Sequence, residues 1–153
     1  MATEDEVLKS ARERLFKAAD NGAQCPCCGR TVKRYRRALN AGMAHFLVLL
    51  CKAYLKNHPR VWVDIKALPV RGGDYAKLLH WGMVKQYVND DPEKRSSGLW
   101  MPTARGLEFA RGDSEEPSHV FLLDNTVVGF EEERIDIHAA LGNKFNFREL
   151  WHG

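Results

Sequence analysis

The sequence predicts an α+β fold, and two patterns carry that prediction. Residues 37–57 place apolar side chains at intervals of three and four, as one face of a long helix requires. Residues 83–88 alternate along the chain as a half-buried strand does, and polar turn residues follow them. The 153 residues are 44% hydrophobic and 28% charged, so an ordinary domain with one core and some additions is expected.

The first part of the chain, residues 1–36, is predicted to hold a helix and a cysteine-rich turn. Apolar residues recur at helical spacing over residues 1–20, and Asn21-Gly22 would end that helix. Cys25-Pro26-Cys27-Cys28-Gly29 follows and resembles half of a zinc knuckle, in which two thiolates and backbone amides hold a tetrahedral metal. The resemblance implies a zinc site on Cys25 and Cys28, joined by Cys27.

A structural zinc needs four ligands, and the sequence has no second Cys-x-x-Cys to supply the others. Candidates for completion are Cys27, His45, Cys51 and His58. Two alternatives remain: a knuckle that has lost its metal, or a tight turn. Cys51 also follows Leu47 by one helical turn on an apolar face, where a buried thiol without a metal is common.

A basic cluster comes directly after the cysteines. Four cations, Lys33, Arg34, Arg36 and Arg37, surround Tyr35. The cations of such a segment can bind phosphates, and the tyrosine can stack on a base. The alternative is the exposed first turn of the helix over residues 37–57.

The middle of the chain is predicted as a series of short elements after that long helix. Pro59 ends the helix, residues 61–63 form a short strand, and Asp64 caps a brief helix through Leu68. Asp74 then caps a helix that Gly82 stops, and residues 83–88 and 99–101 form two strands around a turn-rich loop. Thr103 caps a further helix through Phe109.

This order has a specific resemblance. The residues Leu78-x-x-Trp-Gly-Met-Val84, followed by Leu99-Trp-Met-Pro-Thr-Ala-Arg-Gly106, resemble the wing of winged-helix regulators such as the multiple-antibiotic-resistance repressors. The resemblance covers residues 37–111 and implies a winged-helix domain at residues 37–112 with a nucleic-acid-binding ancestry. Winged helices also serve as protein-docking modules. The side chains expected to be exposed on the recognition helix are Asp74, Tyr75, Lys77 and His80, and they include no arginine for base readout.

Residues 113–153 are predicted to form an acidic tail. Two apolar runs joined by Asp124-Asn125 read as a β-hairpin, and Asp136 caps a short helix to Leu141. A tail of this size cannot bury its own core, so we expect it to pack on the winged-helix domain or on another subunit. The combination of knuckle, winged helix and acidic hairpin is similar to small phage and prophage proteins.

The net charge of +3 conceals a segregation along the chain. Residues 1–20 hold four basic and five acidic residues, residues 21–112 hold sixteen and six, and residues 113–153 hold three and nine, which gives −1, +10 and −6. A basic surface attracts phosphate backbones, although it could instead face its own acidic tail. The predicted nucleic-acid contacts are Arg30, Lys33, Arg34, Tyr35, Arg36, Arg37, Arg71, Lys77, Lys94 and Arg95.

The sequence therefore predicts a nucleic-acid-binding winged-helix protein, a phage or mobile-element accessory or regulatory factor. DNA is the expected partner, and a homodimer is a further expectation. The alternative is a protein-interaction module that binds host machinery through the winged helix or the acidic tail. No enzyme is expected, because no nucleophile elbow or phosphate-cradling glycine loop occurs. The acidic N-terminus and short apolar runs favour the cytoplasm over a membrane.

Overall fold

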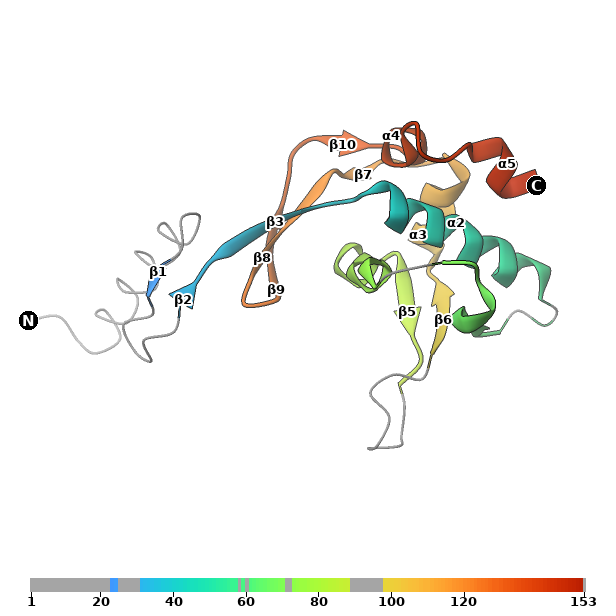
Figure 1. The fold of residues 1–153 in the computed structure, drawn as a ribbon, viewed down its shortest axis with the longest axis horizontal. Helices are drawn as coiled ribbons and strands as arrows, with labels where there is room; N and C mark the ends of the chain where they lie inside the picture. Colours follow the sequence, from blue (N-terminus) through green and yellow to red (C-terminus); the bar gives the residue numbers. More distant parts are fainter. Residues whose placement is uncertain are drawn as a thin grey trace, which may run out of the picture. The chain divides into compact units, whose positions relative to one another are not determined.

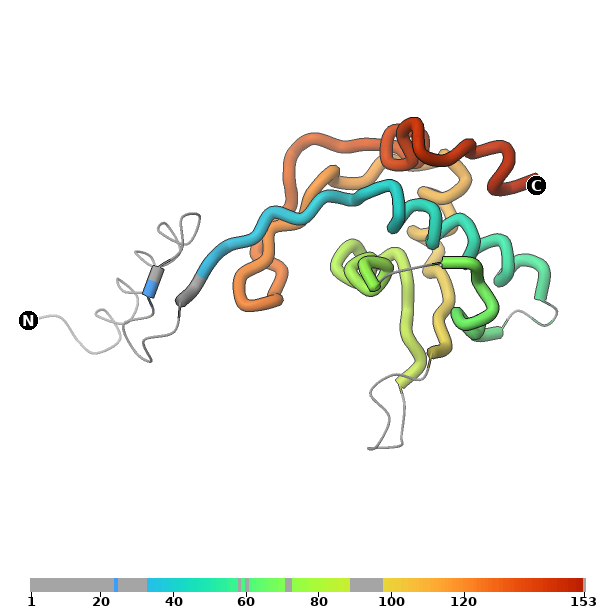
Figure 2. The backbone as a smooth tube through the Cα atoms, viewed as in Figure 1, coloured from blue at the N-terminus to red at the C-terminus, as the bar shows by residue number. Residues whose placement is uncertain are grey.

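A computed structural model describes residues 23–24, 31–57, 59, 61–70, 73–88 and 98–152 (Figures 1 and 2). Helices and antiparallel sheets both occur, so the predicted α+β class is confirmed. The described residues form two compact units, one with the residues up to Ala38 and His119–Glu131, the other with Leu39–Ser118 and the residues from Glu132 onward. This division crosses the predicted boundaries at 36/37 and 112/113, because strand pairing joins residues 34–38 to residues 119–123. The helix expected over residues 1–20 lies outside the described residues.

The first unit is built on a three-stranded antiparallel sheet with the order β3-β8-β9, and β1 pairs separately with β2 (Figure 1). Its strands are β1 (Ala23–Gln24), β2 (Thr31–Val32), β3 (Arg34–Ala38), β8 (His119–Leu123) and β9 (Thr126–Phe130). The predicted hairpin is confirmed: Asp124 and Asn125 join β8 to β9 with φ angles of 49° and 63°. Two consecutive positive φ angles are what a type I′ turn needs, and Asp and Asn tolerate them better than most residues.

Strand β3 corrects the predicted start of the long helix. Helix α2 (Ala41–Lys56) begins at Ala41, whereas the apolar spacing placed its start at Arg37. Asn40 is extended, and its side-chain Oδ1 accepts a hydrogen bond from the backbone N–H of Met43 at 2.9 Å, so it is the N-cap. The residues before it are extended because they pair with β8, from Arg34 opposite Leu123 onward.

The second unit surrounds α2 with short elements. They are β4 (Val63–Asp64), η1 (Ile65–Ala67), η2 (Asp74–Trp81), β5 (Val84–Gln86), β6 (Leu99–Pro102), α3 (Ala104–Arg111), β7 (Glu116–Pro117), β10 (Arg134–Ile135), α4 (Ile137–Leu141) and α5 (Phe147–His152). Three strands form an antiparallel sheet with the order β4-β6-β5. Helix α2 contacts β6, η2, α3, α4 and α5, so it is the centre of this unit's core. Among the described residues, no helix is both long enough and apolar enough to cross a membrane.

Three helix starts and one helix end in the second unit follow the predicted capping chemistry. The side chains of three expected cap residues accept a backbone N–H of the first helical turn, namely Asp64, Thr103 and Asp136. Gly82 ends η2 in the left-handed conformation, with φ 71°, as expected of a helix stop. Asp74 is a correction, because it is the first residue of η2 and makes no cap; Gly73 precedes it instead.

Two hydrogen bonds hold the start of α3 against the turn that follows η2. The hydroxyl of Thr103 donates to the carbonyl of Gly82 at 2.7 Å, and the Thr103 backbone N–H donates to the carbonyl of Met83 at 3.0 Å. A Cβ atom on Gly106 would lie 2.0 Å from that same Met83 oxygen. The Thr-x-x-Gly pattern thus combines a hydroxyl that caps with a glycine that allows the helix to approach this closely.

The residues after Glu132 pack on the helices of the second unit. Strand β10 pairs with β7, the indole N–H of Trp151 donates to the Ala110 carbonyl at 3.0 Å, and Lys52 Nζ donates to the Leu150 carbonyl at 3.2 Å. Strand β7 also holds Glu116, whose buried carboxylate accepts from Arg105 Nε at 2.6 Å and from a second guanidinium nitrogen. This hydrogen bonding raises the pKa of Arg105 and keeps the buried carboxylate paired.

Candidate functional site

Five of the predicted contact residues lie together on the edge strand β3 and the residue before it. We call Lys33, Arg34, Tyr35, Arg36 and Arg37 the β3 strip. Because side chains alternate along a strand, the odd-numbered members lie on one face and the even-numbered members on the other. The basic cluster of the sequence is therefore two rows of side chains on an extended edge, and not the first turn of a helix.

One face of the strip carries a cation, an aromatic ring and a second cation. Lys33 Nζ lies 5.6 Å from the centroid of the Tyr35 ring, and Arg37 Cζ lies 5.1 Å from it. Tyr35 is 46% exposed. Neither cation has an acidic partner among the described residues. We call these three residues the Tyr35 triplet; it combines a partly exposed aromatic ring with two cations that no described carboxylate balances.

The cations on the other face of the strip make contacts within the first unit. Arg34 Cζ lies 5.1 Å from the ring centroid of Phe121 on β8, and Arg36 forms a 3.0 Å ion pair with Glu131. Glu131 belongs to the acidic part of the sequence, so for Arg36 the interpretation that basic residues face the acidic tail is correct. Phe121 and Glu131 were not predicted as site residues. The period-two pattern of residues 33–37 could have indicated a strand, but no local signal names its partner.

Helix η2, expected to be the recognition helix, offers few groups for base readout. Lys77 forms a 3.0 Å ion pair with Asp74. Tyr75, which was expected to be exposed, is half-buried and packs its ring on Phe46 at 4.5 Å and on Trp100 at 5.6 Å. The pKa of His80 is lowered by burial and then by the Lys77 charge, which disfavours its cationic form.

The remaining predicted contacts and the predicted zinc ligands lie outside the described residues. They are Arg30, Arg71, Lys94 and Arg95, with Cys25, Cys27 and Cys28, and His58 among the candidate completing ligands. Within the described ranges, no group of three or more His, Cys, Asp or Glu residues could hold a metal ion. Cys51 is fully buried, and burial raises the pKa of its thiol to about 12, as the alternative of a buried thiol requires.

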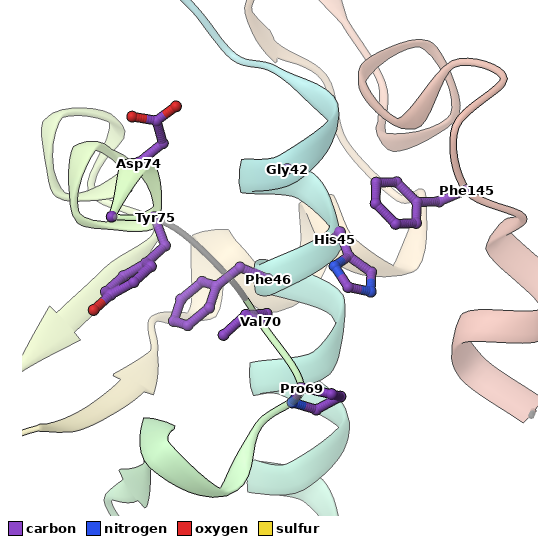
Figure 3. A pocket seen from close by; sticks show the side chains of 9 residues that line it. Gly42, His45, Phe46, Pro69, Val70, Asp74, Tyr75 and Phe145 are labelled. Carbon is purple, nitrogen blue, oxygen red and sulfur yellow. The ribbon is translucent and has the colours of Figure 1, made fainter.

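A pocket of about 430 Å³ lies between α2 and the start of η2 (Figure 3). Its lining is Gly42, His45, Phe46, Pro69, Val70, Gly73, Asp74, Tyr75 and Phe145. The imidazole of His45 stacks on Phe145, with centroids 4.1 Å apart and planes 5° from parallel. Burial lowers the pKa of His45, so the pocket wall favours the neutral imidazole.

Acid should weaken the second unit in part through His45. A histidine whose pKa is lower in the folded state stabilises the fold fully above its unfolded value of about 6.5, and this stability is lost as the pH falls below that value. We therefore expect the melting temperature to fall between pH 7.5 and pH 5.5, and His45→Phe, which keeps the ring stack, to lose less over that interval. Melting followed by circular dichroism tests this, and an equal loss in both proteins would contradict it.

No family model, curated protein or solved structure matches this chain. The resemblance of residues 37–111 to winged-helix regulators therefore stays a prediction. The function is inferred below from the chain's own residues, among which the β3 strip has the highest density of cations.

Proposed function

We propose that this chain is a winged-helix protein that binds nucleic acid through the phosphate backbone, as an accessory or regulatory factor. The observation that carries the proposal is the Tyr35 triplet, where Lys33 and Arg37 have no acidic partner among the described residues. Two cations that no described carboxylate balances, on one strand face, attract an anionic polymer, and phosphates are the groups they would hold. By contrast, Arg36, Lys77 and Arg105 are each paired with a carboxylate.

The winged-helix part of the proposal is supported by the order of elements in the second unit. Helix α2 is followed by β4, η1, η2, β5, β6 and α3, and the sheet order is β4-β6-β5. In this proposal η2 is the recognition helix, and β5 and β6 are the strands of the wing. Because η2 presents no arginine, the proposal is one of backbone contact without base-specific readout.

The proposal is tested by titrating labelled duplex and single-stranded oligonucleotides with the full chain at several salt concentrations. We expect binding at low salt that weakens as salt increases, with a logarithmic slope of about −2 to −4 for two to four phosphate contacts. A gel shift and a fluorescence anisotropy titration should agree. No binding of any oligonucleotide at low salt would remove the proposal.

Glu131→Gln should strengthen nucleic-acid binding several-fold. The change removes the carboxylate charge that pairs with Arg36 at 3.0 Å, so the guanidinium becomes available to a phosphate. We expect the slope of affinity against salt to steepen by about 1, since one more phosphate is contacted.

The matched control is Glu132→Gln, which makes the same charge change one residue along the chain at an exposed side chain. It should change the affinity by less than twofold. Equal gains from both variants would mean that net charge alone acts, and that the ion pair does not restrain Arg36.

A second candidate function, docking of another protein, is favoured by the outer face of the β4-β6-β5 sheet. Strand alternation puts Trp62 and Tyr87 on the face opposite to the buried Trp100. Their rings meet edge to face at 5.5 Å, Tyr87 is 43% exposed, and the neighbouring Val88 is 79% exposed. Exposed apolar groups of this kind mark interaction surfaces. If the chain binds no oligonucleotide, protein docking at this face is the function to test next.

A further inference from the structure

We propose that the β3 strip is built for unpaired nucleic acid, with a base stacked on the Tyr35 triplet and phosphates held by Lys33 and Arg37. This inference rests on the proposed nucleic-acid-binding function and adds the class of strand. The inference depends on Tyr35, because binding of phosphates alone would need only the two cations of the triplet.

The exposure of Tyr35 is the first argument. Its ring is 46% exposed on an edge strand whose other odd-numbered side chains are cations. In a duplex the flat faces of the bases are covered by their neighbours, so an aromatic side chain outside the grooves gains nothing from them. An unpaired base offers its face, and stacking of bases on aromatic rings is the recurring mode of single-strand binding.

The geometry of the cations is the second argument. Lys33 and Arg37 are two residues before and two residues after Tyr35, so the three side chains lie in one row with neighbours about 7 Å apart along the strand. The Arg37 guanidinium lies over the Tyr35 ring, 5.1 Å from its centroid, and presents a planar cation on which a base can stack. A base that stacks on this layer has a positive charge at each end of the row for its flanking phosphates.

The opposite face of β3 differs in how its cations are paired. Arg34 Cζ lies 5.1 Å from the ring centroid of Phe121, and Arg36, whose side chain is 53% exposed, is paired with Glu131. The Tyr35 face, which β3 shares with Val120 and Leu122 of β8, thus holds two cations that no described carboxylate balances, whereas Arg36 on the other face is paired. The single strand is therefore assigned to the face of Tyr35.

The test compares three probes of about twelve nucleotides and one sequence: single-stranded DNA, single-stranded RNA and duplex DNA. Anisotropy titrations use the full chain and the variants Tyr35→Leu and Tyr35→Phe. We expect wild type to bind a single strand at least tenfold more tightly than duplex. Tyr35→Leu should lower single-strand affinity by about tenfold to a hundredfold and duplex affinity by less than twofold, whereas Tyr35→Phe keeps both.

Each outcome decides the matter. Tighter binding of either single-stranded probe than of duplex supports the proposal. The single-stranded probe that binds more tightly shows whether DNA or RNA is preferred. Equal binding of single strand and duplex by wild type overturns it while leaving the proposed function in place, and this comparison needs no variant to fold. Equal losses on both probes in Tyr35→Leu, with an unchanged circular dichroism spectrum, also overturn it. No binding of any probe overturns the proposed function and this inference together.

Discussion

Replacing Gly106 with alanine should destabilise the second unit by about 3 kcal/mol or more, because the added methyl group has no room. Its Cβ would lie 2.0 Å from the carbonyl oxygen of Met83 and 2.9 Å from the carbonyl carbon. Both contacts are with backbone atoms, so no side chain can rotate away. The start of α3 would have to leave Met83, which breaks the two hydrogen bonds that Thr103 makes to Gly82 and Met83.

The measurement is urea unfolding followed by tryptophan fluorescence, with Gly42→Ala as the matched control. A Cβ on Gly42 would meet only the side chain of Asn40, at an ordinary 3.5 Å. Alanine should therefore leave stability unchanged at this exposed helical position or raise it by up to about 1 kcal/mol. A Gly106→Ala protein that unfolds at the urea concentration of wild type would contradict the close approach of α3 to Met83.

Local chemistry allowed much of the second unit to be predicted. Caps at Asp64, Thr103 and Asp136 depend on a side chain that reaches a backbone N–H two or three residues away, and the left-handed stop at Gly82 depends on one residue. Such features need no knowledge of distant residues. The Asp124-Asn125 hairpin was predictable for the same reason.

Contacts between distant residues account for the corrections. The long helix was expected to start at Arg37, with a first helical turn as the alternative for the basic cluster before it. Residues 34–38 instead pair with residues 119–123, and tertiary pairing outweighs the weak local preference of a basic segment. Tyr75 was expected to be exposed on the recognition helix, yet its ring packs on Phe46 and Trp100. Neither partner is near Tyr75 in the sequence.

The candidate site shows the same division between local and distant information. The sequence alone identified the four cations of residues 33–37 and the tyrosine between them, Tyr35. It could not identify which of the cations are neutralised, because Glu131 approaches Arg36 only when β9 follows β8 in the sheet. The difference in cation pairing between the two faces of β3 therefore comes from the sheet and not from the basic run itself.

Reversing the charge of both cations in the Tyr35 triplet should have the largest effect on nucleic-acid binding. With Lys33→Glu and Arg37→Glu together, we expect affinity for single-stranded DNA at low salt to fall by about a hundredfold or more, since two attractive charges become repulsive. The slope of affinity against salt should become shallower by about 2, because two phosphate contacts are lost. Both side chains are exposed, so the variant should keep the circular dichroism spectrum of wild type.

The matched control, Lys144→Glu with Arg148→Glu, makes the same change in net charge at two exposed positions of the second unit. If binding depends on a built row of cations, this control should lose less than about fivefold and keep the salt slope, because it changes only the diffuse field of the protein. Equal losses in the two double variants would mean that net charge governs binding and that β3 has no special part in it. A loss confined to the β3 variant would assign the phosphate contacts to Lys33 and Arg37, whose charges no described carboxylate balances.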